Sequence, residues 1–429
     1  MAFNFNKMDK IIITIIMSCL FVFNLQAQDN TSQKQRLDFA QMYLEAGGNF
    51  FPSFTGKQMI NGEVMPIDYS ATLNPYITWG GFHFWGHTEF YVTFPLSQIN
   101  LDGNDAQHKM LHSVATGARI YPWAMKKGKL RPYIGFNWGA LTFEQIPQTG
   151  EKHTAIAKDF MLNFDAGLMY SYKKIAFRMA VNYFPNTKWK YPLSKTDMTE
   201  IKTPSYSIQF GLLYSFDATK NNTQKNLDQW NSYPSVSKLS YDAKSFGDFF
   251  IGVGPSISFS LSNSAYNAQE FPYLQQRLAS SSYLDFALGY HFNKANFFTA
   301  LSFRNPTFTT EGFGTKQTLQ KNSWTLEANK FLIDFSGFAP YIGLNLAYDT
   351  IEYTEEVDGS KRSFNYSSFE PGLTFGWDIV PGKTNEAIIL RTNLRWYPYS
   401  SFKVDGKAFD FSQLEYNLIQ VVFYPQRLF

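Results

Sequence analysis

Apolar and polar residues alternate one by one along many segments of this chain, and this pattern constrains the fold more than any other feature. In residues 206–216, large apolar side chains alternate mostly with Ser, Gln and Gly, and residues 160–172 follow the same rule. Successive side chains of a β-strand point to opposite faces. A period of two therefore predicts strands with one bulky apolar face and one small or polar face.

Strand length and loop length decide which face meets which medium. The alternating segments are about ten residues long, which matches the roughly 9–11 residues of a tilted strand that crosses a bilayer. Long connections alternate with short ones such as Lys173-Lys174, and Trp and Tyr residues cluster near strand ends. Both features are typical of membrane β-barrels, which turn apolar residues to lipid and polar residues inward. The alternative is a secreted, soluble all-β protein with an aromatic core. The predicted strands lie at 42–51, 70–80, 84–95, 111–121, 130–144, 160–172, 175–185 and 204–216, and at 248–260, 280–292, 295–304, 322–332, 338–352, 366–378, 386–397 and 414–424.

The N-terminus predicts export. Two lysines precede an apolar run that ends near Leu25-Gln26-Ala27, as in a secretory signal peptide spanning 1–27. The single cysteine, Cys19, lies inside this run, so a lipoprotein cleaved there is an alternative. A membrane anchor is disfavoured because the run falls short of about 20 apolar residues. The net charge of +3 and the absence of any basic run argue against a nucleic-acid partner.

A long-range repeat indicates that the chain is duplicated. Pro-Tyr-Ile-Gly-Phe-Asn at 132–137 recurs as Pro-Tyr-Ile-Gly-Leu-Asn at 340–345, and 206–214 aligns with 416–424 at nearly the same offset. Each copy contains about eight predicted strands, about sixteen in all. We expect a first β-barrel in 28–216, a polar periplasmic linker in 217–247 and a second β-barrel in 248–429.

The mature chain resembles Gram-negative outer-membrane β-barrel proteins, and each half resembles the small eight-stranded barrels of the OmpA and OmpX type. The resemblance rests on the end of the first half, where Gln209, Gly211, Tyr214 and Phe216 fit the family's barrel-assembly signal. The second half ends in Phe429, as family members often do, although Val422 and Pro425 depart from the pattern. The resemblance implies location in the outer membrane, contact with its lipid, and recognition by the barrel assembly machinery.

Sixteen strands permit two architectures, namely two tandem eight-stranded barrels filled by side chains, or one sixteen-stranded porin-like barrel with an aqueous lumen. The polar linker, the signal ending at Phe216 and the nearly balanced inward charges of each half favour two barrels. By the alternation, the inward charges are Glu45, Glu89, Arg119, Asp165 and Arg178 in the first half, and Asp285, Arg304, Glu327, Glu370, Arg391 and Arg395 in the second. We interpret them as an interior charge network that holds each barrel closed, the alternative being the lining of a permeation path.

Motifs for chemistry are weak. The six histidines lack metal-ligand spacing, and no cofactor motif is present. A lipid hydrolase could use Ser113 with His112 or His153, but adjacent residues of a strand face opposite sides and no nucleophile elbow is present. We therefore predict a non-enzymatic protein with a structural or binding role, whose external loops meet a surface ligand or a neighbouring membrane protein. The alternative is a porin-like channel for passive diffusion of small polar solutes.

Overall fold

The computed structural model describes residues 41–101, 108–123, 125, 130–146, 155–216, 246–275, 277–334, 337–380 and 387–428. All described residues belong to one compact unit, Arg36–Phe429. The predicted signal peptide with Cys19, nearly all of the predicted linker, and Phe429 lie outside the described residues.

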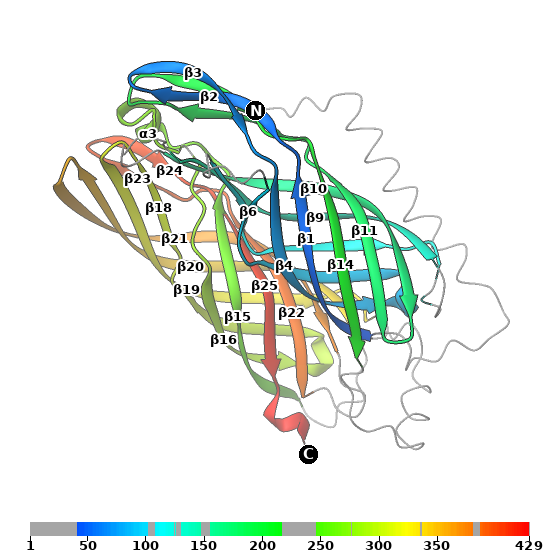
Figure 1. Cartoon of the computed structure of the whole chain (residues 1–429). Coiled ribbons are helices and arrows are strands. Elements are labelled where there is room, and N and C mark those ends of the chain that lie inside the picture. Colours follow the sequence, from blue (N-terminus) through cyan, green and yellow to red (C-terminus); the bar gives the residue numbers. More distant parts are fainter. Residues whose placement is uncertain are drawn as a thin grey trace, which may run out of the picture. The chain divides into compact units, whose positions relative to one another are not determined.

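The first half forms one closed antiparallel sheet, which we name barrel 1 (Figure 1). Its strands are β1 (Gln41–Phe51), β4 (Thr72–His83), β5 (Thr88–Pro95), β8 (Ala115–Ile120), β9 (Leu130–Gln145), β10 (Ile156–Tyr172), β11 (Ile175–Tyr183) and β14 (Tyr206–Phe216). They follow one another in chain order, and β1 closes the ring by pairing with both β4 and β14. Two short strands, β6 (Ile99–Asn100) and β7 (His108–His112), add to β4 and β9.

The second half forms barrel 2 in the same way. Its strands are β15 (Gly247–Ser260), β16 (Tyr283–Phe292), β17 (Phe297–Arg304), β19 (Thr315–Phe331), β20 (Phe338–Val357), β21 (Ser360–Ile379), β22 (Ile388–Tyr397) and β25 (Gln413–Phe423). The pairings β17–β19 and β15–β25 complete the ring, and β18 (Thr307–Gly312) adds to β19.

The prediction of two tandem eight-stranded barrels is therefore confirmed, and the single sixteen-stranded barrel is wrong. In one wide barrel β14 would have to pair with β15, whereas β14 returns to β1 and β15 pairs with β25. The predicted repeat fits this arrangement. Residues 132–137 and 340–345 lie near the starts of the two fifth strands, and residues 206–214 and 416–423 fall on the two eighth strands, with Tyr424 one residue beyond.

The outer surface of barrel 2 shows where lipid ends. Along β20 the outward residues are Ile342, Leu344, Leu346 and Tyr348, and then the series becomes Thr350, Glu352, Thr354 and Glu356. The neighbouring β19 changes in the same way, from Asn322 to Trp324. The apolar part of β20 spans about nine residues, close to what a tilted strand needs to cross a bilayer. The rest of β18–β21 therefore forms a polar-faced sheet that continues past the membrane boundary.

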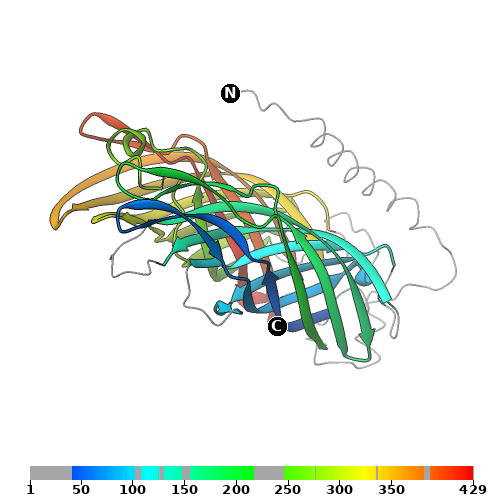
Figure 2. The same ribbon diagram turned by 45° about the horizontal axis from the view of Figure 1, so that its top comes forward.

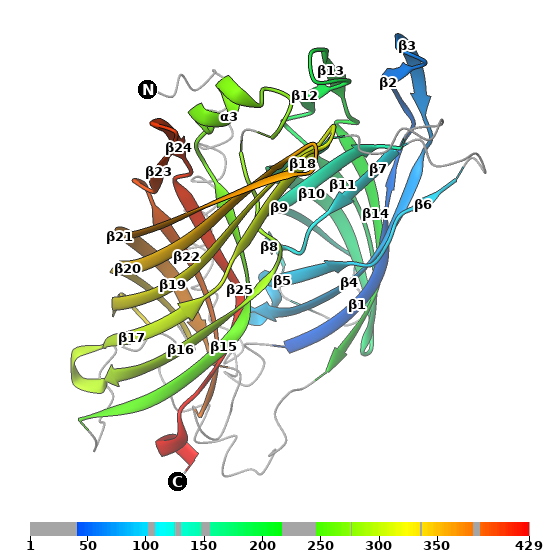
Figure 3. The ribbon, with the colours of Figure 1, turned by 90° about the vertical axis from the view of Figure 1, so that its left-hand side faces the viewer.

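The two ends of the barrels differ. At one end, which we name the short-turn end, Lys173-Lys174 joins β10 to β11, and single-turn 3-10 helices η2 (Phe84–Gly86) and η3 (Asn293–Ala295) join other strand pairs. The opposite, long-loop end carries β2 (Phe54–Ile60) paired with β3 (Glu63–Tyr69), β12 (Lys188–Pro192) paired with β13 (Met198–Lys202), helix α3 (Ala265–Glu270), and β23 (Ser401–Val404) paired with β24 (Lys407–Asp410) (Figures 2 and 3). None of the described helices is both long and apolar enough to span a membrane.

Tight turns shape this long-loop end. The β2–β3 hairpin turns at Asn61-Gly62, β20–β21 at Asp358-Gly359 and β23–β24 at Asp405-Gly406, and all six residues have positive φ. Asn-Gly and Asp-Gly pairs favour such two-residue turns, because Gly adopts positive φ without strain and Asn or Asp tolerates it. Long, regular hairpins therefore form where the alternation alone indicates loops.

The two barrels pack against each other along an apolar seam inside the compact unit. Ile257, Phe259, Tyr416 and Leu418 of barrel 2 point outward from their sheet and yet are buried. They cluster with barrel 1 residues such as Trp138, whose ring lies 5.5 Å from that of Tyr416. Outward apolar residues that would otherwise meet lipid are thus covered by the neighbouring barrel.

Candidate functional site

A buried carboxylate joins two arginines at the centre of barrel 1. Glu89 on β5 is within 2.8 Å of Arg119 Nη1 through Oε1, and within 2.8 Å of Arg178 Nη2 through Oε2. Arg119 Nε also contacts Asp165 Oδ2 at 2.6 Å, and Arg178 Nη1 contacts Glu45 Oε2 at 2.8 Å. All five side chains are buried, and we name them the barrel 1 network. The sequence-predicted inward charges of the first half thus meet in one cluster drawn from five strands.

Tyrosine hydroxyls supply further hydrogen bonds to this network. Tyr43 and Tyr121 donate to the two oxygens of Glu89, and Tyr76 donates to Glu45 at 2.8 Å. Hydrogen-bond donors around a buried carboxylate offset the free-energy cost of removing its charge from water. The network is therefore both paired and hydrogen-bonded, which is the condition under which buried charges are tolerated.

Barrel 2 pairs its charges at different positions. Arg395 bonds Asp285 at 2.6 Å and Glu327 at 2.7 Å. Glu415 accepts from Arg304 and, at 2.9 Å, from Lys321, whose Nζ also contacts Asp349 at 3.0 Å. These seven buried residues are the barrel 2 network, defined by Asp285, Arg304, Lys321, Glu327, Asp349, Arg395 and Glu415.

Two other predicted residues of barrel 2 stand apart from this network. Arg391 forms a two-bond fork with Asp378, with both distances 2.7 Å, and its guanidinium lies 4.0 Å from the centroid of the Phe298 ring. Glu370 accepts from Ser368 at 2.7 Å and from Ser400 at 3.3 Å, and no basic side chain among the described residues pairs with it. Glu370 is therefore held by hydroxyl groups rather than by an ion pair.

Four buried charged residues of barrel 2 are not among the predicted inward charges: Lys321, Asp349, Asp378 and Glu415. Lys321 lies one residue before the predicted strand at 322–332, in a predicted loop, although it shares the inward face of Ser323. The alternation already places Asp349 and Asp378 on the inward face, and that signal alone could have found them. Glu415 precedes a β-bulge between Asn417 and Gln420, where the pairing of β22 with β25 shifts register. In such a strand the alternation of inward and outward side chains holds only up to the bulge.

The predicted assembly signal lies on the last strand of barrel 1, apart from Phe429. Tyr214 points outward, whereas Gln209 points inward and donates to Tyr76 at 2.8 Å. Gly211 faces Glu45 so closely that an added Cβ would lie 2.0 Å from its carboxylate oxygen. Gln209 and Gly211 of the predicted signal therefore serve the interior packing of barrel 1.

Apolar layers lie on both sides of each network. In barrel 1 one cluster lies mainly toward the short-turn end and contains Tyr43, Phe82, Tyr91, Tyr121, Tyr133, Met169, Ala176, Ala180 and Leu213, although Tyr91 also lies beside Arg119 of the network. The cluster toward the long-loop end contains Phe51, Tyr69, Met110, Leu141, Phe143, Met161, Phe184, Trp189, Tyr191, Leu193 and Ile201. Barrel 2 has Phe250, Phe298, Ala300, Phe331, Ala339, Tyr341, Ile389, Val422 and Tyr424 toward the short-turn end. Toward its long-loop end lie Tyr266, Phe271, Tyr273, Leu274, Leu278, Phe308, Leu319, Ile351, Tyr353, Phe402, Val404, Phe409 and Phe411. Buried side chains thus occupy the described lumen of each barrel on both sides of its network.

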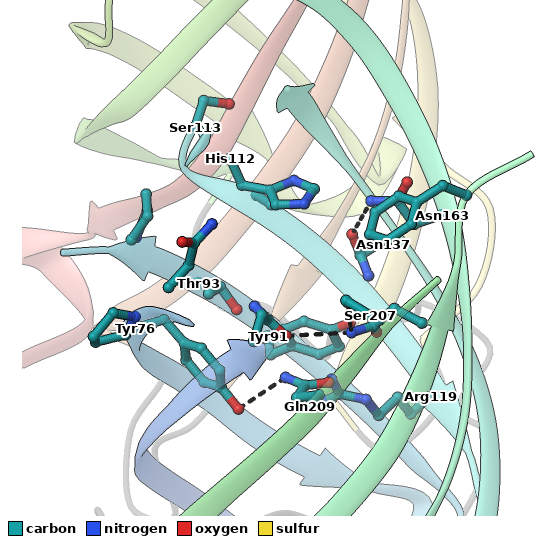
Figure 4. Close-up of a pocket in the computed structure, with 17 residues that line it drawn as sticks. Tyr76, Tyr91, Thr93, His112, Ser113, Arg119, Asn137, Asn163, Ser207 and Gln209 are labelled. Carbon is teal, nitrogen blue, oxygen red and sulfur yellow. Dashed lines mark hydrogen bonds between the residues drawn. The ribbon is translucent and has the colours of Figure 1, made fainter. Parts of the chain in front are cut away.

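One polar cavity of about 50 Å³ lies between the barrel 1 network and the apolar layer toward the long-loop end (Figure 4). Its lining includes Asn49, Asn74, Asn137, Asn163 and Asn182, and we name it the asparagine chamber. The strand registers set Asn49 opposite Asn74 and Asn137 opposite Asn163. Five strands therefore bring one amide each to the same level of the barrel.

Ser113 and His112, two of the residues weighed for lipid hydrolysis, each contact other groups. Ser113 Oγ accepts from the backbone N–H of Ala140 at 2.8 Å and donates to Val114 O at 3.1 Å. The His112 ring stacks between Phe51 and Phe184. His153 lies outside the described residues. Among the described residues, no group of three or more His, Cys, Asp or Glu side chains is arranged to hold a metal ion.

A second polar cluster fastens the elements above barrel 2, beyond the membrane boundary at Tyr348. Glu355 accepts from Arg362 Nε at 2.8 Å and from Tyr266 OH at 2.9 Å, and Arg362 Nη1 reaches Asp405 at 2.6 Å. We name Tyr266, Glu355, Arg362 and Asp405 the cap cluster. Burial raises the pKa of the Tyr266 hydroxyl, and its hydrogen bond to Glu355 raises it further. The cluster ties α3 and the β23–β24 hairpin to β20 and β21.

Comparison with known proteins identifies outer-membrane barrels at very low similarity. No family model matches the chain, and no curated protein matches it. An outer membrane channel from Pseudomonas putida F1 aligns at 9% identity over 90% of this chain and 95% of its own, with a TM-score of 0.20. OmpT of Vibrio cholerae aligns at 6% over 90% and 97%, with a TM-score of 0.17, and the P. putida toluene transporter TodX at 6% over 90% and 90%, with 0.14. Values this low carry no functional argument.

Proposed function

We propose that this outer-membrane β-barrel protein is a membrane-embedded scaffold, which holds the elements of its long-loop end at the cell surface for binding. The outer-membrane location agrees with two closed barrels that turn apolar residues to lipid and charges inward. The long-loop end is then external and the short-turn end periplasmic. The proposed partners of the protein are outer-membrane lipid, the barrel assembly machinery, and a surface ligand or neighbouring membrane protein.

The observation that carries this proposal is the filling of both lumens. In each barrel a layer of ion pairs lies between two apolar layers, one toward each end. Passive diffusion of polar solutes needs a continuous water-filled path, and eight-stranded barrels are just wide enough for side chains to fill them. A lumen occupied by side chains does not support permeation, so we assign the function to binding by the surface elements.

Those surface elements form a defined platform. The β18–β21 sheet, α3 and the β23–β24 hairpin share an aromatic core above barrel 2, and the cap cluster locks them together. Pre-organised surfaces lose less conformational entropy on binding than mobile loops do. Such a platform suits a binding role better than it suits a gate.

Planar bilayer recordings test this function. We expect refolded, heat-modifiable protein to give no stable conductance under conditions in which a general porin, the positive control, opens reproducibly. Stable open channels would instead support the porin-like alternative and remove the scaffold proposal. We also propose that the protein is not an enzyme, so lipid deacylation should be absent from the wild-type protein and unchanged in Ser113→Ala.

A further inference from the structure

We propose that the asparagine chamber of barrel 1 binds a small neutral solute that carries both hydrogen-bond donors and acceptors, such as a primary amide or a short polyol. This goes beyond the scaffold role, because it assigns a ligand site inside a barrel rather than on its surface. Three features of the chamber support this site: unpartnered buried groups, a lining without a free charge, and a position inside the barrel.

Hydrogen-bonding groups in the chamber are only partly satisfied by one another. Asn182 Nδ2 donates to Asn49 Oδ1 at 3.2 Å and to Ser207 Oγ at 3.1 Å, and Asn163 Nδ2 donates to Asn137 Oδ1 at 3.1 Å (Figure 4).

Three other polar atoms on the chamber wall have no hydrogen-bond partner among the described residues. They are Asn74 Oδ1, Asn163 Oδ1 and the Tyr91 hydroxyl. Their residues are only 4%, 2% and 4% exposed. Buried polar groups are rarely left without a partner, because each one then retains its full desolvation cost. The chamber therefore presents acceptors and a hydroxyl to whatever occupies it.

The walls favour a neutral occupant. Arg119, the cationic residue in the lining, is already engaged by Glu89 and Asp165 below the chamber. The remaining polar lining consists of amides, hydroxyls and the His112 ring. An ion entering such a site would lose its hydration without gaining a counter-charge, whereas an amide or polyol exchanges water hydrogen bonds for protein ones. An amide is matched best, since it offers N–H donors to the two free Asn oxygens and a carbonyl to the hydroxyl.

Size and access set further limits. A cavity of about 50 Å³ is room for roughly three to five water molecules, and hence for a solute of about four to six heavy atoms. His112 and Phe184 line the chamber, and both rings lie against Phe51, with ring centroids 5.6–5.9 Å apart. The solute enters past these rings, and Arg119 of the barrel 1 network lines the chamber.

Saturation-transfer NMR on the full-length refolded protein tests the site with defined probes. We expect saturable binding of acetamide or glycerol, and the two probes distinguish amide from polyol preference. Acetate, the anionic isostere of acetamide, and N,N-dimethylacetamide, which lacks N–H donors and is larger, should not bind. Failure of both neutral probes, leaving water as the occupant, would overturn the proposal, as would acetate binding as tightly as acetamide.

Variants locate the binding in the chamber. Asn163→Leu should weaken binding about tenfold, which corresponds to about 1.4 kcal/mol, and Asn74→Leu serves as a second variant if the first does not fold. Asn329→Leu is the matched control, because Asn329 is a fully buried asparagine of barrel 2 whose amide atoms are also unpartnered. Loss of binding in the chamber variants alone supports the site. Equal loss in the control, or unchanged binding in a folded chamber variant, would place binding elsewhere.

Discussion

The fifth strands of the two barrels carry the same inward triplet and use it differently. Barrel 1 has Tyr133, Gly135 and Asn137, and barrel 2 has Tyr341, Gly343 and Asn345 at matching places. In barrel 1 an added Cβ on Gly135 would lie 2.5 Å from Asp165 Oδ1 and 2.6 Å from Arg119 Cγ, so this glycine makes room for an ion pair. In barrel 2 the closest side chain to Gly343 is the neutral Asn329, and the charges pair elsewhere.

The charge networks of the two barrels nevertheless have one arrangement in common. Each contains one carboxylate that accepts from two basic residues, Glu89 in barrel 1 and Glu415 in barrel 2. The comparison shows that a filled barrel constrains the pairing of its charges and the volume of its side chains. It does not require particular positions, so the two barrels pair their charges through different residues.

Breaking one network should affect only its own barrel, and this is the largest effect we expect. Arg178→Met leaves Glu45 without its arginine and Glu89 with one, and should destabilise barrel 1 by about 3–5 kcal/mol. Arg395→Met should do the same to barrel 2 through Asp285 and Glu327. Hydrogen exchange at increasing denaturant measures both, because peptides from each barrel report their own unfolding. Equal destabilisation of both barrels by either variant would show that they unfold as one unit.

Adding a side chain at Gly211, where the backbone lies close to Glu45, should destabilise barrel 1 less than breaking its network does. A side chain there meets the Glu45 carboxylate, which Arg178 and Tyr76 hold in place, so Gly211→Val should destabilise barrel 1 by about 1–3 kcal/mol. Gly139→Ala is the milder control, since its added Cβ would first meet Ala115 Cβ at 3.0 Å. Thermal unfolding followed by the gel shift of heat-modifiable barrels measures both. A Gly211 variant as stable as the Gly139 variant would mean that Glu45 can move.

Much of this architecture is predictable from sequence. The alternation identifies the strands and the inward charges, because a membrane barrel imposes a period of two on nearly every residue. Inward residues meet, however, only if the strands are staggered correctly, and the stagger follows from closure of the whole sheet. The five asparagines of the chamber all lie on inward faces, but their meeting at one level depends on registers such as Asn49 opposite Asn74. The bulge in β25 breaks the period locally and obscures Glu415 in the same way.

Breaking the cap cluster should loosen the elements above barrel 2 without opening the barrel. Arg362→Met removes the hydrogen bonds to Glu355, Asp405 and the Tyr266 hydroxyl, but Tyr266 and Tyr353 still donate to Glu355. We expect a loss of about 1–2 kcal/mol, confined to α3 and the β23–β24 hairpin. Limited proteolysis should then cut near the hairpin while barrel 2 stays heat-modifiable. Loss of the barrel itself would show that the cap and barrel fold as one cooperative unit.

The smallest effect should come from the exposed ion pair between the barrels. Lys195 Nζ lies 3.2 Å from Asp358 Oδ2, and their side chains are 42% and 68% exposed. Solvent screens such a pair, so Lys195→Ala should change stability by less than about 0.5 kcal/mol. Trp138→Ala, which opens the apolar seam beside Tyr416, is the contrasting variant and should separate the barrels more readily once the linker is cleaved. If the lysine variant loosened them as much as the tryptophan variant did, surface charge rather than buried apolar area would join the two halves.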